Sequence, residues 1–116
     1  MIKSPHPALD LSFMCPRKVG CGMIYWNVET TGSYTEDCKL GGQYGTEFLT
    51  YIGRHPTNGN ATLLGCIVAD MDGHPATGLK IGFMAEVNRY AMGLARIIHG
   101  PGSIAENLAS AAGGEA

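Results

Sequence analysis

The sequence has little positive charge, and that charge is scattered. Its 116 residues include 8 Lys and Arg against 10 Asp and Glu, which gives a formal net charge of -2. Arg17 and Lys18 form the one adjacent basic pair. Non-specific affinity for nucleic acids comes mainly from clustered Lys and Arg. The composition therefore argues against direct nucleic-acid binding.

Long apolar runs are also missing. No stretch approaches the roughly 20 residues that a helix needs to cross a bilayer. The first ten residues hold two prolines and lack the apolar core of a signal peptide. We therefore expect no membrane contact and a cytoplasmic location, where the four cysteines would be reduced.

Metal and phosphate motifs are absent as well. Structural zinc sites favour cysteines with two to four residues between them. Here Cys15 and Cys21 have five residues between them, and Cys38 and Cys66 each stand alone. Glycine is abundant, 17 of 116 residues, yet neither a GxGxxG nor a Walker pattern occurs. We predict neither a metal nor a cofactor.

Two local groups are compatible with catalysis, but neither has a motif. Cys21 lies between two glycines and near two cations, which would favour its thiolate form. Asp70, Asp72 and His74 cluster at a turn and could serve acid–base chemistry. An inert cysteine in a turn and a solvated loop are the commoner explanations. We predict no catalytic residue.

Residues 78–99 make the clearest pattern in the chain. At about 100° per residue, one broad apolar face forms on a helix. Glu86, Arg89 and Arg96 lie opposite, with the small residues Gly82 and Gly93 beside them. We predict that the whole apolar face is the core: Leu79, Phe83, Met84, Val87, Tyr90, Ala91, Leu94, Ala95, Ile97 and Ile98.

A second helix is expected to run to about Arg54. Ser33 and Glu36 fit a capping box, in which each side chain satisfies a backbone donor of the other residue. Gly41 and Gly45 fall within its apolar arc, although glycine in a helix costs about 1 kcal/mol relative to alanine. The pair indicates a close approach to the backbone, by another helix or by a ligand.

The remaining segments complete an α+β prediction that is mostly helical. Residues 61–71 fit a helix better than a buried strand, and Asn60 is a possible cap. Residues 11–15 and 23–30 fit the strands of a ribbon, and a second capping box at Ser103 opens a short helix to 110. We predict a short N-terminal β-ribbon packed on three to four α-helices. The chain forms a single compact domain over 1–116, with a loose arm at 1–9 and a frayed tail at 111–116.

The function that these features favour is non-catalytic binding of a macromolecular partner, most plainly a protein. Arginine and aromatic residues dominate interface hot spots. The candidate partner-binding residues are Arg17, Lys18, Tyr25, Trp26, Arg89 and Arg96, with the more exposed of Tyr25 and Trp26 making the contact. Compact acidic proteins are common in phages and mobile elements, so inhibition or modulation of a host complex is one version. A binder of a small nucleotide-like ligand, using the glycines and tyrosines, and a small Cys-dependent enzyme are the alternatives. An oligomer is possible.

Overall fold

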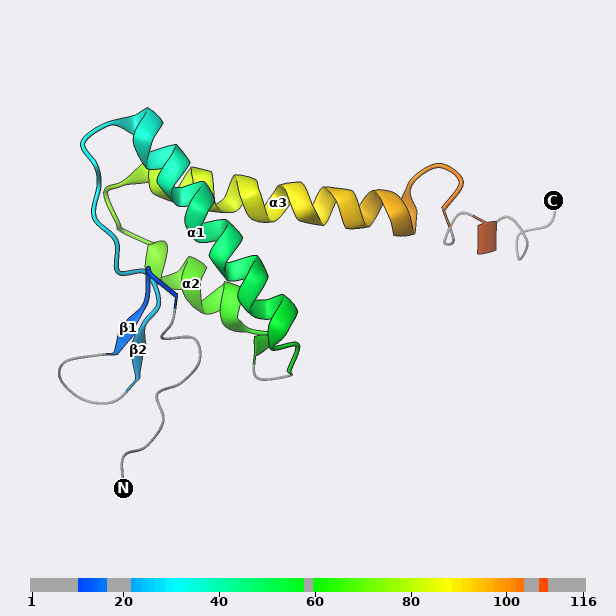
Figure 1. Cartoon of the computed structure of the whole chain (residues 1–116), viewed down its shortest axis with the longest axis horizontal. Coiled ribbons are helices and arrows are strands. Elements are labelled where there is room, and N and C mark those ends of the chain that lie inside the picture. The colour runs from blue at the N-terminus through cyan, green and yellow to red at the C-terminus, as the bar shows by residue number, and fades with distance from the viewer. Residues whose placement is uncertain (1–10, 17–21, 58–59, 104–106, 109–116) are drawn as a thin grey trace, which may run out of the picture.

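The computed structural model describes residues 11–16, 22–57, 60–103 and 107–108. In chain order the elements are β1 (Cys15–Pro16), β2 (Met23–Ile24), α1 (Tyr34–Arg54), α2 (Leu63–Met71) and α3 (Thr77–His99). Figure 1 shows α1, α2 and the ribbon gathered around the start of α3, whose other end runs away from them. The predicted class, mostly helical α+β with a short ribbon, is confirmed.

Parts of the prediction lie outside the described residues. These are the arm at 1–9, the tail at 111–116 and most of the short helix expected at 103–110. The ribbon is antiparallel, with Cys15 opposite Ile24, and its strands are shorter than expected. Before β1 the chain turns, with the Met14 N–H donating to the Leu11 carbonyl, and this turn buries Phe13.

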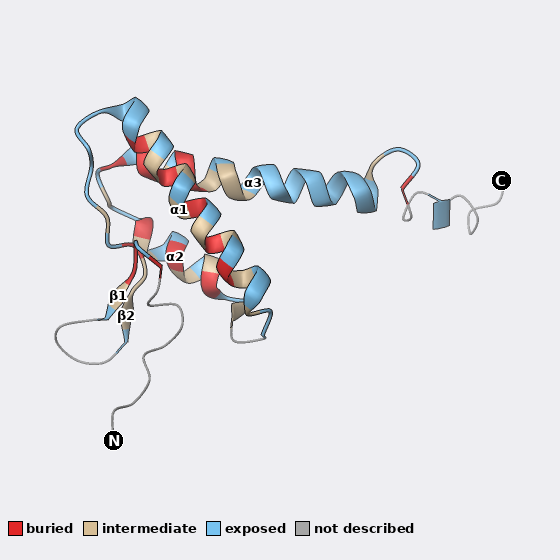
Figure 2. Cartoon of the chain, viewed as in Figure 1, coloured by how far each residue is buried: buried red, intermediate tan, exposed pale blue. Residues whose placement is uncertain are grey.

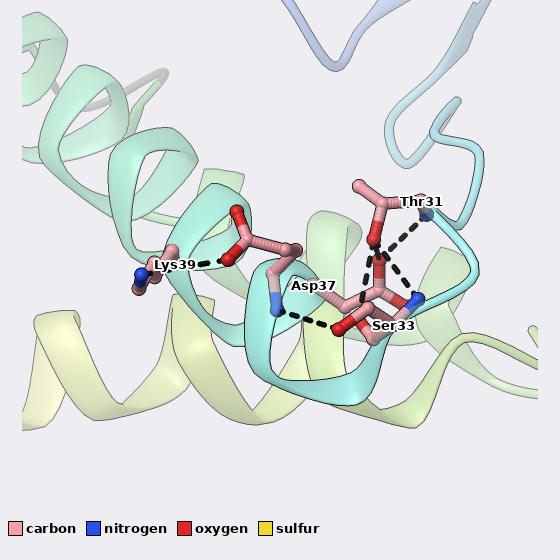
Figure 3. Close-up of polar contacts among 5 residues, drawn as sticks. Thr31, Ser33, Asp37 and Lys39 are labelled. Atoms are coloured by element: carbon pink, nitrogen blue, oxygen red, sulfur yellow. Dashed lines mark hydrogen bonds and ion pairs between the residues drawn. The ribbon is translucent and has the colours of Figure 1, made fainter.

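The start of α1 is fixed by side chains of the preceding loop. The Ser33 hydroxyl accepts a hydrogen bond from the Glu36 N–H, which is half of the predicted capping box. The Glu36 carboxylate pairs with Lys39 instead of returning to Ser33. Asp37 is buried and accepts hydrogen bonds from the Thr31 N–H at 2.6 Å and the Thr31 hydroxyl at 2.7 Å (Figure 3).

Asp37 also accepts a hydrogen bond from the Thr30 hydroxyl at 2.5 Å. The Thr30 hydroxyl, followed by the N–H and hydroxyl of Thr31, lowers the pKa of Asp37 below its usual range. The ionised carboxylate therefore ties the chain that leaves the ribbon to the first turn of α1.

Glycines set the contact between α1 and α3. A Cβ added to Gly82 would lie 2.8 Å from the carbonyl carbon of Cys38 and would collide with its oxygen. A Cβ on Gly41 would lie 2.9 Å from the Phe83 nitrogen, and one on Gly45 would lie 2.8 Å from the Glu86 Cβ. The close approach predicted at the α1 glycines is therefore made by a helix. The placement of Gly82 on a polar face was wrong, because this residue is buried in the crossing.

The segment left open between helix and strand is the helix α2. Its buried side consists of Leu63, Ile67 and Met71, one turn apart. Asn60 does not cap it: the N-cap is Thr62, and the Asn60 amide donates instead to the His55 carbonyl at 2.8 Å.

The core is aromatic where the ribbon meets α1 and α3. The Phe13 ring lies 5.6 Å from the Trp26 ring and 5.5 Å from the Phe83 ring, and Trp26 lies 5.3 Å from Phe83. Tyr44 and Phe48 of α1 close the cluster. Such tilted and edge-to-face pairs contribute about 0.5 to 1.5 kcal/mol beyond their buried area.

The predicted core face of α3 is half right. Leu79 and Phe83 are fully buried, and Met84 and Val87 pack against the core. Residues 88–99, here called the outer half of α3, are all exposed (Figure 2). The prediction that this part of the face is buried was wrong, because α1 crosses α3 at its glycine-bearing first turns and no described element follows the helix further.

Candidate functional site

The outer half of α3 is a regular helix that extends beyond its own core. Nothing in residues 88–99 interrupts the helix, and Gly93 has open space around its Cα. The helix ends at Gly100, with Arg96 and His99 in the last turn, where positive charge complements the helix dipole. Residues 88–99 are therefore helical although no described element of the chain packs along them.

One face of this outer half is apolar, and it continues one residue back to the half-buried Val87. We define the apolar stripe as Val87, Tyr90, Ala91, Leu94, Ile97 and Ile98, which recur at the three- and four-residue spacing of one helix face. Tyr90, Leu94, Ile97 and Ile98 are between 39% and 67% exposed. Taking the roughly 200 Å² of an aromatic side chain as an upper value for each, they leave up to about 400 Å² of mainly apolar surface in solvent. A patch of that size is as large as the largest on typical monomers, where it is often functional.

Met92 provides a useful contrast on the same helix. It is 64% exposed, close to the 58% of Leu94, but it lies about 160° around the helix from that residue. The Asn88 amide donates to its sulfur at 3.3 Å. Met92 is therefore exposed on the face opposite the stripe.

A groove of about 460 Å³ adjoins the stripe. α1 and α2 supply one side of it, and Val87, Tyr90, Ala91 and Leu94 of the stripe supply the other. No Lys or Arg is among its lining residues in the described part of the chain, which are Phe48, Leu49, Ile52, His55, Pro56, Thr57, Asn60, Ala61, Leu64, Val87, Tyr90, Ala91 and Leu94. The stripe and the groove together form one continuous apolar surface.

Charge lies beside this surface rather than on it. The Arg89 guanidinium donates to both carboxylate oxygens of Glu86, at 2.8 and 3.3 Å, and the Thr46 hydroxyl donates to the same carboxylate at 3.2 Å. The hydrogen bond from Arg89 lowers the pKa of Glu86, and the carboxylate in turn raises the pKa of Arg89. The Arg89 guanidinium also lies 4.9 Å from the centre of the Tyr90 ring. This ion pair marks where the α1–α3 crossing ends and the outer half begins.

The predicted partner-binding residues fall into separate places. Arg17 and Lys18 lie outside the described residues. Trp26 is buried in the core, and its indole N–H has no hydrogen-bond partner among the described residues. Tyr25 is half-buried against the core, so it is the more exposed member of that pair.

Arg89 and Arg96, the other two predicted residues, lie on the exposed part of α3. They lie on the side of the helix away from the apolar stripe, near Met92. The sequence interpretation assigned the stripe itself to the core. The glycine spacing is the signal that separates the buried part of the α3 face from the exposed part. Gly41 and Gly45 of α1 have the same four-residue spacing as Gly78 and Gly82 of α3. This pairing places α1 against the first turns of α3 and leaves the later turns uncovered.

Two of the residues considered for catalysis, Asp70 and His74, serve as tethers. Asp70 accepts a hydrogen bond from the Tyr25 N–H at 2.8 Å. The His74 Nδ1 accepts from the Ala76 N–H at 3.1 Å, which leaves its Nε2 to donate to the Val28 carbonyl at 3.0 Å. The hydrogen bonds to Tyr25 and Val28 fasten the extended chain after β2 to the end of α2 and to the loop beyond it.

Metal-binding and membrane-spanning features are not found in the described part of the chain. No group of three or more His, Cys, Asp or Glu side chains there is placed to hold a metal ion. None of the described helices combines the length and the apolar character needed to span a bilayer. Of the cysteines, Cys15, Cys38 and Cys66 are free thiols, and Cys21 lies outside the described residues.

No family model, no curated protein sequence and no solved structure matches this chain.

Proposed function

We propose that this protein is a non-catalytic binding module that holds a protein partner on the apolar stripe of α3. The observation that carries the proposal is the exposure of that stripe on a regular helix leading away from the core. Amphipathic helices commonly bind by laying such a face, with anchors at three- and four-residue spacing, against an apolar groove or a second helix. Tyr90 adds an aromatic anchor of the kind enriched in hot spots.

The cellular setting remains part of the proposal. The three free thiols are in the state that a reducing cytoplasm maintains. Inhibition or modulation of a host complex by a phage or mobile-element protein is one activity that a small binding module of this kind performs. Arg17, Lys18 and Tyr25 are retained as a second surface to test.

A small-ligand binder is the second candidate, because the groove beside the stripe has the volume of a ligand site. Its roughly 460 Å³ lies within the range of about 300 to 1,000 Å³ for such pockets. Against a nucleotide-like ligand, the described groove lining offers no Lys or Arg for a phosphate, and Gly41 and Gly45 face α3. The Cys-dependent enzyme stays a prediction, because its candidate thiol, Cys21, lies outside the described residues. Native mass spectrometry of the purified chain tests the small-ligand candidate, which requires a bound small mass.

The proposed function is tested by affinity capture from the cells in which the chain is naturally made. Three baits are compared: the parent chain, Leu94→Glu in the stripe and Met92→Glu on the opposite face. We expect the parent and Met92→Glu to retain the same protein and Leu94→Glu to lose it. Both positions are exposed, so circular dichroism should find all three chains folded. Equal retention by Leu94→Glu would refute the assignment of the stripe, and an Arg17→Glu, Lys18→Glu bait then tests the second surface.

A further inference from the structure

We propose that the occupant of the apolar stripe is a second copy of this chain, bound antiparallel through the outer half of α3. This inference rests on the proposed function and names the partner of the same surface.

The spacing of the stripe is self-complementary. Val87, Tyr90, Leu94 and Ile97 are separated by three, four and three residues, which is the a/d spacing of two-helix packing. If two copies pair antiparallel about position 92, Tyr90 of one lies opposite Leu94 of the other, and Val87 lies opposite Ile97. Each layer then occurs twice, as the two-fold symmetry of a homodimer requires.

The residues that flank this seam allow two identical helices to approach. Ala91 and Gly93 border it, and both are small. The flanking charge is Glu86, which is already paired with Arg89. No like charges therefore meet across the seam. The antiparallel arrangement also opposes the two helix dipoles and places the two cores at opposite ends of the pair.

In the proposed dimer, the C-terminal end of α3 from one copy would lie at the groove of the other copy. In this register Ile97 and Ile98 of one copy reach the level of Val87 on the other. Val87 lines the groove together with Leu49 and Ile52 of α1. The end of each α3 thus covers the apolar groove of its partner, which has no cover within the described part of a single chain.

The area supports a specific but weak dimer. The four large side chains leave up to about 400 Å² exposed on each copy, or up to about 800 Å² on two. The groove residues outside the stripe, among them Leu49, Ile52 and Leu64, would add to this area, and specific interfaces begin at roughly 1,000 Å². A contact of this size is at the small end of specific interfaces, where weak and transient associations are found.

Sedimentation velocity on the purified full chain tests the dimer, at concentrations from about 1 μM to about 1 mM. The parent and Met92→Glu should pass from monomer to dimer over the same range. Leu94→Glu should weaken association at least about a hundredfold, because each dimer would bury two carboxylates against tyrosine rings. A parent that stays monomeric, or a Leu94→Glu dimer as tight as the parent, overturns the inference.

Mixing two variants tests the register. Tyr90→Lys and Leu94→Glu should each be monomeric alone. An equimolar mixture should recover a dimer, because the antiparallel register places position 90 of one chain opposite position 94 of the other and leaves the second such layer native. A parallel pair would bring position 90 opposite position 90, so mixing would leave each charge opposite an uncharged native residue and would restore no native layer. Failure of the mixture to associate overturns the antiparallel register.

The other occupants give different results. If the purified chain is monomeric and the affinity capture still retains a protein through Leu94, the second copy is wrong and the proposed function stands. If the monomer floats with phospholipid vesicles in a Leu94-dependent way, the stripe is a lipid contact and both are wrong. If the dimer forms through Leu94, both are supported.

Discussion

The glycine crossing makes the sharpest prediction about stability: Gly82→Ala should destabilise the fold. A Cβ at this position would collide with the Cys38 carbonyl of α1, whose backbone cannot rotate out of the way as a side chain can. Overpacking a close contact costs typically about 1 to 3 kcal/mol. We place Gly82→Ala near the upper end of that range, because backbone meets the new methyl group. Alanine returns about 1 kcal/mol through its better helix propensity, so the net loss is about 2 kcal/mol.

The matched control is Gly93→Ala on the same helix. Gly93 has nothing within 4 Å of an added Cβ, so the propensity gain should appear alone, as about 1 kcal/mol of added stability. In thermal melts of a domain of this size, about 1 kcal/mol corresponds to about 4 to 8 °C. The two variants should therefore shift the Tm in opposite directions. Urea titrations at low protein concentration measure the same differences without a contribution from self-association.

A double variant separates a shared contact from two independent defects. Gly41→Ala meets the Leu79 carbonyl from the other side of the crossing. Once one methyl group has pushed the helices apart, the second should cost less stability. The double variant should therefore lose less free energy of unfolding than the sum of the losses of Gly41→Ala and Gly82→Ala. A rise in Tm for Gly82→Ala like that of Gly93→Ala would refute the reasoning, since it would require helices too far apart to contact at this glycine.

Three further predictions concern the core, the start of α1 and the loop before α3. Phe83→Ala should cost about 3 to 5 kcal/mol in urea titrations because Phe83 is fully buried, whereas Leu94→Ala should change stability by less than about 0.5 kcal/mol at low protein concentration. Asp37→Asn should lower the Tm at neutral pH. The hydrogen bonds from Thr30 and Thr31 lower the pKa of Asp37, so the stabilisation by its carboxylate is present above pH 3.8 and is lost as the pH falls further. The Tm values of parent and variant should therefore converge at low pH. His74→Ala removes two hydrogen bonds to the backbone and should cost about 2 kcal/mol, with an unchanged Tm contradicting the tether.

Local patterns predicted the helices better than the sequence predicted their partners. The cap at Ser33 and the stop after Arg54 set α1 to within a residue, because these signals act within one helical turn. The glycines of α1 predicted a close crossing, which is a property of backbone space alone. Phe13 was not recognised as a centre of the core, because its partners Trp26 and Phe83 are distant in sequence and its own segment forms only a turn.

The error on α3 has a different origin. An apolar helix face indicates that its burial is favourable, but it does not indicate which molecule packs against it. Leu79 and Leu94 follow the same helical period, yet one is fully buried and the other is 58% exposed. A helix of 23 residues is about 35 Å long, and one crossing helix covers only a few turns of it. The hydrophobic period of residues 78–99 therefore continues past the point where this chain supplies a surface. A sequence that keeps such a period over the outer half is patterned for a contact that a single described copy does not make, and this links the function we propose to the packing of α3.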